Sequence, residues 1–177
     1  MAATVVIAET NGPQGSETES IDPINLNFGS VDDAALDPSA HPITAQADGH
    51  SFEKWVRLYV SDMGSSSIVD NFKVWLSNLG GGFGTGEGIS TNARESGYTP
   101  AAYPVAGPVE TDSAVATLAM PETEPAGPNL GISGTLPGQI STGGSYSDWL
   151  VLQLDVSEST PAGSLNQKTF TFQWDEQ

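Results

Sequence analysis

Apolar and polar residues alternate along several short segments, with the period of two that is typical of a half-buried β-strand. The clearest example is FEKWVRLYVS (residues 52–61), which places Val56, Leu58 and Val60 on one face. The same alternation recurs at 24–30, 70–78, 148–156 and 168–176. These patterns predict strands that bury one face together, with a core that includes Val56, Leu58, Val74, Leu152, Leu154, Phe170 and Phe172.

No long segment shows the 3.6-residue apolar period of a helix, and the best helical candidate, VDDAALD (31–37), would form only a turn or two. The 20 glycines and 12 prolines are spaced as turn residues between the predicted strands. Short strands with Gly/Pro turns favour an all-β protein, and we expect an immunoglobulin-like antiparallel β-sandwich. A jelly-roll type barrel is the alternative.

The length of 177 residues suits one domain. Residues 1–20 are expected to form an N-terminal arm or edge strand, and residues 21–177 a single sandwich domain. Val5, Val6 and Ile7 would pair within the parent sheet or add a strand to a neighbouring chain. The alternation weakens over about 79–147, which we interpret as extended loops. Short strands are expected there at 87–92, 113–119 and 130–134.

The chain carries 22 acidic and 5 basic residues, a formal charge of −17. Binding of nucleic acid or of an anionic membrane needs clustered Lys and Arg, so neither is expected as a partner. There is no cysteine for disulfides or thiolate metal sites. The N-terminal apolar run is short and has no preceding basic residue, and no stretch has the length of a membrane span. We therefore expect a soluble protein made in a cytoplasm without a signal peptide.

Three of the five basic residues, Lys54, Arg57 and Lys73, lie among aromatic residues within 50–76. The alternation points Trp55, Arg57 and Tyr59 outward from one strand, and Lys73 and Trp75 outward from the next. The short connection DMGSSSI (62–68) predicts that strands 52–61 and 68–77 form an antiparallel pair, with Arg57 beside Lys73 or Trp75.

The outward aromatic and cationic side chains have two interpretations. The long middle loops could cover them, or they could form a contact surface for a protein or a sugar, because Trp, Tyr and Arg are enriched at binding hot spots. The candidate partner-binding residues are Val5, Val6, Ile7, Trp55, Arg57, Tyr59, Lys73 and Trp75.

The sequence offers little for catalysis. His41 and His50 lie in no triad or metal-ligand spacing, and the nucleophile-elbow, zinc-protease and P-loop motifs are absent. The glycine-rich run at 80–88 lacks the spacing of a dinucleotide-binding loop. We predict no enzyme, no catalytic residues and no cofactor. One open alternative is calcium, for which the aspartates of VDDAALD with Asp48 could supply oxygen ligands; otherwise they form a solvated acidic surface.

The segments KWVR (54–57), FKVW (72–75) and TFTFQWDE (169–176) resemble strands in a group of tailed-bacteriophage virion proteins. The resemblance covers most of the chain from about residue 24. It implies an immunoglobulin-like sandwich with a structural role in the virion and no catalytic residues.

The expected function is therefore that of a capsid decoration protein that binds the shell and stabilises it. Its expected partners are capsid or other virion proteins. The chain itself is expected to form a homo-oligomer within a large assembly. One alternative is a carbohydrate-binding or adhesin module on a tail or fibre, using Trp55, Tyr59 and Trp75. The other is a subunit of another filament or appendage.

Overall fold

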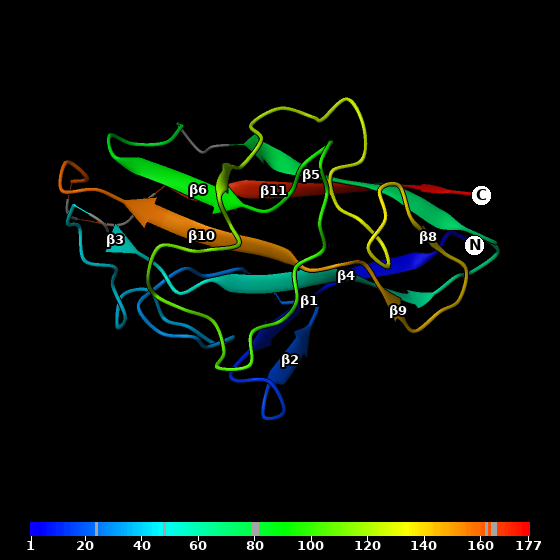
Figure 1. Cartoon of the computed structure of the whole chain (residues 1–177), viewed down its shortest axis with the longest axis horizontal. Coiled ribbons are helices and arrows are strands. Elements are labelled where there is room, and N and C mark those ends of the chain that lie inside the picture. The colour runs from blue at the N-terminus through cyan, green and yellow to red at the C-terminus, as the bar shows by residue number, and fades with distance from the viewer. Residues whose placement is uncertain (24, 48, 79–81, 162, 164–165) are drawn as a thin grey trace.

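The structure is a computed structural model that describes residues 1–23, 25–47, 49–78, 82–161, 163 and 166–177. The described residues form strands and no helix (Figure 1). No described helix is therefore long and apolar enough to cross a membrane. The strands are β1 (Thr4–Asn11), β2 (Thr18–Ile21), β3 (Gly49–His50), β4 (Lys54–Asp62), β5 (Val69–Asn78), β6 (Glu87–Thr91), β7 (Leu118–Ala119), β8 (Gln139–Ile140), β9 (Ser145–Tyr146), β10 (Leu150–Val156) and β11 (Thr169–Glu176).

The strands form two antiparallel sheets that do not close into a barrel. Sheet A has the order β2-β1-β4-β10-β6-β7, with β3 paired to β10 and β9 paired to β4. Sheet B has the order β11-β5-β8. The predicted antiparallel sandwich is confirmed, and the barrel alternative is not observed.

The core lies between the sheets and contains the apolar rows that the alternation predicted. β4, β5 and β10 each contribute such a row of buried side chains. Phe170 and Phe172 also pack against this core, but they are only half-buried because β11 is the edge strand of sheet B. The buried core residues of these three strands are Val56, Leu58, Val60, Val69, Phe72, Val74, Leu76, Leu150, Leu152, Leu154 and Val156.

The predicted pairing of strands 52–61 and 68–77 is wrong. β4 pairs with β1, β9 and β10 in sheet A, whereas β5 pairs with β8 and β11 in sheet B. Each strand has a dense apolar row, and placing the strands in opposite sheets lets those rows pack against each other across the core. The connection between them therefore turns a corner of the sandwich. Arg57 accordingly lies on a different sheet from Lys73 and Trp75.

The two chain termini hold this corner. The Ser65 amide donates to the Met1 carbonyl at 2.8 Å, and the Ile68 amide donates to the Gln177 carbonyl at 3.1 Å. The Ala3 amide donates to the Glu176 carboxylate at 2.8 Å. Both termini consequently lie at the same end of the molecule (Figure 1).

The N-terminal segment forms a strand of sheet A. Val5, Val6 and Ile7 stand opposite Val60, Tyr59 and Leu58 of β4, so the parent-sheet interpretation is the one observed. β2 pairs only with the second half of β1, from Ala8 to Asn11, which leaves the first half at the margin of the sheet.

Fewer strands form in the irregular regions than the pattern predicted. β6 matches the expected strand at 87–92, but only Leu118–Ala119 of 113–119 is strand, and Ile132 makes an isolated bridge to Thr135. The segment 25–30 is not a strand, although Leu26 and Phe28 pack against the core; Ile24 lies outside the described residues. VDDAALD forms bends and a turn, since the Asp33 side chain accepts the Ala35 amide instead of allowing a helix.

Candidate functional site

The cationic and aromatic side chains on the outer face of sheet A form an ordered stack. The Tyr59 and Tyr146 rings stack with their centroids 4.6 Å apart, because β9 places Tyr146 opposite Tyr59. The Arg57 guanidinium carbon lies 3.7 Å from the centroid of Tyr146 and 4.2 Å from that of Trp149. We call the four residues Tyr59, Tyr146, Arg57 and Trp149 the arginine ladder. The guanidinium is thus in contact with two aromatic rings.

Glu19 of β2 accepts hydrogen bonds from two members of the arginine ladder, Arg57 and Tyr146. Its Oε2 accepts hydrogen bonds from Arg57 Nη2 at 2.6 Å and Nε at 3.2 Å. Its Oε1 accepts the Tyr146 hydroxyl at 2.8 Å. Burial, followed by the bond to the Glu19 carboxylate, raises the pKa of Tyr146. Arg57 therefore has its charge balanced and its planar group held within the chain.

Trp55 lies beneath a cover formed by the middle loop. Its ring meets Tyr103 edge-on at 5.3 Å and Trp149 at 6.0 Å, and the residue is 1% exposed. Its indole N–H donates to Glu53 Oε2 at 2.9 Å. The other members of this second apolar cluster are Val151, Ala101, Val115 and Ala116. On this face, the interpretation in which loops cover the aromatic row is the one observed.

A groove remains open between the β1–β2 hairpin and the loop that carries Tyr103. It has a volume of about 410 Å³. Aromatic, cationic and carboxylate groups meet in it, and the Tyr103 hydroxyl donates to the Gly12 carbonyl at 2.7 Å on the hairpin side. Such a mixture can hydrogen-bond a polyol and stack against its ring. The lining residues are Thr10, Gln14, Glu17, Glu19, Arg57, Tyr103 and Trp149.

The candidate partner-binding residues do not form one surface. Trp75 and Lys73 lie on sheet B, where Lys73 pairs with Glu124 at 3.0 Å. A sugar platform of Trp55, Tyr59 and Trp75 is therefore wrong, because Trp55 is buried, Tyr59 is stacked on Tyr146 and Trp75 belongs to the opposite sheet.

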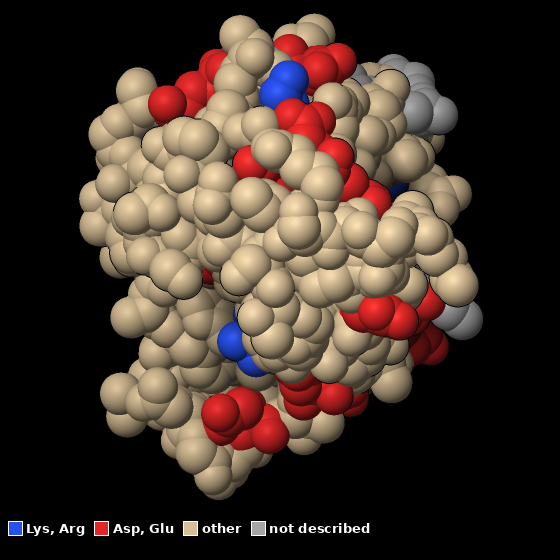
Figure 2. All heavy atoms as spheres, turned by 90° about the vertical axis from the view of Figure 1, so that its right-hand side faces the viewer, with Lys and Arg blue, Asp and Glu red and all other residues tan. Residues whose placement is uncertain are grey.

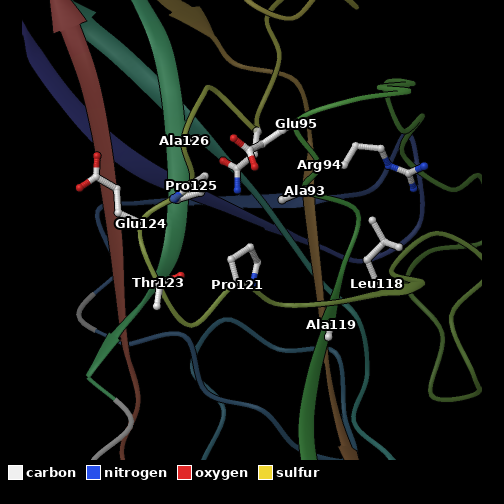
Figure 3. A pocket seen from close by; sticks show the side chains of 11 residues that line it. Ala93, Arg94, Glu95, Leu118, Ala119, Pro121, Thr123, Glu124, Pro125 and Ala126 are labelled. Carbon is white, nitrogen blue, oxygen red and sulfur yellow. The ribbon is translucent and has the colours of Figure 1, made fainter.

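A second pocket lies beside β7 and has a volume of about 450 Å³. Figure 3 shows that small and proline side chains line it together with charged ones, from residues 93–95, β7 and the loop that follows β7. The Arg94 guanidinium extends away from the Glu95 carboxylate in this view. Among the described residues, Arg94 has no carboxylate within ion-pair distance, whereas Lys54, Arg57, Lys73 and Lys168 each have one.

His50 has contacts that its position in the sequence did not predict. Its Nδ1 lies 2.9 Å from Asp155 Oδ1, and Ser90 donates its hydroxyl to the other Asp155 oxygen. The carboxylate stands between the hydroxyl and the imidazole. His50 is therefore not placed to take a proton from Ser90, as the base of a catalytic triad would.

The predicted calcium ligands are only partly described, since Asp48 lies outside the described residues. The side chains of Asp33 and Asp37 accept the amides of Ala35 and Ser39. Within the described ranges, no group of three His, Cys, Asp or Glu side chains is placed to hold a metal ion. Asp32 instead faces β1, where its side chain accepts the Gly12 amide.

Sequence reasoning missed several members of this site. Trp149 directly precedes β10 and is an outward position of the alternation at 148–156, so the pattern could have included it. Glu19, Tyr103 and Tyr146 carry no local signal, because each reaches Arg57 or Trp55 only through the pairing of distant segments. Comparison of the chain with protein-family models, characterised proteins and solved structures gives no match.

Proposed function

We propose that this chain is a non-enzymatic structural protein of a tailed-bacteriophage virion, attached to the capsid surface as a decoration protein that stabilises the shell. The resemblance of its strands to virion proteins supports this role. An antiparallel sandwich with the outer aromatic row of sheet A packed under a loop is suited to a rigid accessory subunit.

The observation that carries the proposal is the distribution of charge. Four of the five basic residues are ion-paired within the chain, in a protein with a formal charge of −17. Figure 2 shows acidic groups spread over one face, with few basic groups among them. Such a surface repels free copies and neighbouring particles, and it favours a partner that presents positive or polar groups.

The test is to compare particles that carry the protein with particles assembled without it. We expect many copies on each capsid, loss of occupancy as ionic strength rises, and heads that break at lower temperature when the protein is missing. Absence from purified capsids, or equal head stability with and without the protein, would contradict the proposal. Filaments formed by the isolated protein would instead support the appendage-subunit alternative.

The groove on sheet A favours carbohydrate binding as a second candidate function. Trp149, Tyr103 and Arg57 contribute aromatic and cationic groups, and Glu17 and Glu19 contribute acceptors for sugar hydroxyls. We expect glycan-array binding that is lost in Trp149→Ala and retained in the matched control Trp75→Ala. Binding that depends on Trp75 would place the sugar on sheet B, and no binding to any glycan would eliminate this candidate.

A further inference from the structure

A cluster of buried polar side chains lies where β1, the start of β4 and residues 32–33 meet. Glu9 and Asn11 alternate on the same face of β1 as Val5 and Ile7, which pack against the core. Lys54 Nζ donates to Glu9 Oε1 at 2.8 Å and to the Asp33 carbonyl at 3.0 Å. We call Glu9, Asn11, Asp32 and Lys54 the polar nest.

Asp32 joins the polar nest through the backbone. Its Oδ2 accepts the Gly12 amide at 2.6 Å, directly after Asn11. Glu9 and Lys54 are 0% and 1% exposed, and Asn11 is 5% exposed. Three of the four side chains are therefore almost entirely removed from water.

The polar nest contains atoms without hydrogen-bond partners. These are Glu9 Oε2, Asn11 Oδ1, Asn11 Nδ2 and Asp32 Oδ1, and the only other such buried atom on a described residue is Asp70 Oδ1. Among the described residues, the Asn11 side chain makes no hydrogen bond, although it lies on the same face of β1 as Glu9 and directly before Gly12. Buried polar groups in proteins are normally satisfied, and a local concentration of exceptions is typical of a place that holds water or an ion.

The charge of the polar nest is also unbalanced. Glu9 and Asp32 share one ammonium group, that of Lys54, and the charges of Asp33 and Glu53 are close enough to affect Asp32. Burial raises the pKa of Asp32, and Asp33 and Glu53 add to that effect. Because buried charge without a counter-charge is costly, this region favours a second positive charge.

We propose that the polar nest binds a calcium ion through Glu9 Oε2, Asn11 Oδ1 and Asp32 Oδ1. Calcium accepts carboxylate and amide oxygens and fills the rest of its shell with carbonyls or water. Lys54 stays on the other Glu9 oxygen, so the ion and the ammonium group occupy opposite sides of that carboxylate. The ion ties β1 to the segment around Asp32. This inference is independent of the proposed virion role.

The test is calcium titration calorimetry and thermal unfolding of the full chain after treatment with a chelator. We expect one calcium-binding event and a rise of several degrees in Tm that the chelator reverses, because a ligand that binds only the folded state stabilises it. Glu9→Gln and Asp32→Asn should each weaken the affinity by about tenfold or more. Asn11→Asp should strengthen it by supplying a third carboxylate. Asp70→Asn is the matched control, since Asp70 has the other buried carboxylate oxygen that lacks a partner among the described residues, and it should leave the affinity unchanged.

Three outcomes would overturn the proposal. The first is that millimolar calcium produces no heat of binding and no change in Tm. This includes the case in which only acidification stabilises the protein, because protonation of Asp32 would then be sufficient to explain its buried position. The second is binding that survives both Glu9→Gln and Asp32→Asn, which would place the ion elsewhere on the acidic surface. The third is a crystal grown with calcium in which the polar nest holds water only. If Glu9→Gln does not fold, wild type and Asn11→Asp still decide the matter.

Discussion

β4 and β5 carry nearly the same sequence pattern but have different surroundings. Each alternates a core row with an outward row that contains a cation and a tryptophan. β4 is flanked by β1 and β10 and is covered on its outer face, so that Trp55 is buried. β5 lies in the smaller sheet, where Trp75 is only half-buried and Lys73 pairs with Glu124, whose side chain is about half exposed.

The difference shows that alternation determines which face of a strand enters the core but not what covers the other face. The cover over Trp55 comes from Tyr103 and Trp149, and the counter-charge of Arg57 comes from Glu19 of the β1–β2 hairpin. An outward tryptophan can therefore be part of the folded interior on one sheet, while the tryptophan of the other sheet stays partly exposed.

The largest expected effect comes from removing the strand that supports β4. Deletion of residues 1–18 should prevent folding, because β4 loses its partner from Thr4 to Thr10 and Lys54 loses Glu9. Circular dichroism and thermal unfolding measure this, with deletion of residues 1–3 as the control that keeps β1 intact. A cooperative transition at the wild-type temperature would show that residues 1–18 are a dispensable arm.

Replacing Trp55 of sheet A and Trp75 of sheet B compares the contribution of the two outer faces to stability. Trp55→Ala should lower the free energy of unfolding by about 3–5 kcal/mol, since it leaves a cavity under the loop. Trp75→Ala should cost less than about 1.5 kcal/mol, because its ring is already partly in water. Urea unfolding of both variants gives the difference, and equal losses would contradict the assigned burial.

Replacing Lys54 of β4 and Lys73 of β5 compares a buried ion pair with a more exposed one. Lys54→Met should cost about 3 kcal/mol, because it leaves Glu9 buried without its counter-charge. Lys73→Met should cost less than about 1 kcal/mol, since its partner Glu124 is about half exposed. The double variant Glu9→Leu/Lys54→Met should recover much of the loss in urea unfolding. No recovery would mean that the role of Lys54 is not to pair with Glu9.

The sequence predicts those features of the fold and the site that depend on neighbouring residues, and it does not predict those that depend on residues far apart in the chain. The inward rows of β4, β5 and β10 were correct, because a period of two directly gives the face that is buried. The pairing of β4 with β5 was wrong, because a short linker fits a corner between sheets as well as a hairpin. The arginine ladder and the polar nest could not be derived, since Tyr146, Glu19 and Asp32 reach their partners only through sheet register and loop path.

The smallest expected effect concerns the carboxylate of Asp70 in β5. Burial, and then the charge of Asp175, raises the pKa of Asp70 above 3.8. The folded state thus holds this proton more tightly than the unfolded state, so the ionised group destabilises the fold at pH 7. Asp70→Asn should stabilise the protein there by less than about 1 kcal/mol, and the gain should vanish as pH falls through the raised pKa to 3.8. Thermal unfolding against pH checks this, and a gain that persists in acid would contradict it.

Hydroxyl-radical footprinting of the isolated native protein tests most directly whether the outer face of sheet A is an internal packing surface. Mass spectrometry would follow oxidation of Trp55 and Trp75 in the same sample, with the urea-unfolded chain as the reference for full reactivity. We expect Trp55 to remain protected, as its 1% exposure requires, while Trp75 is oxidised. Equal oxidation of the two residues in the native state would contradict the account.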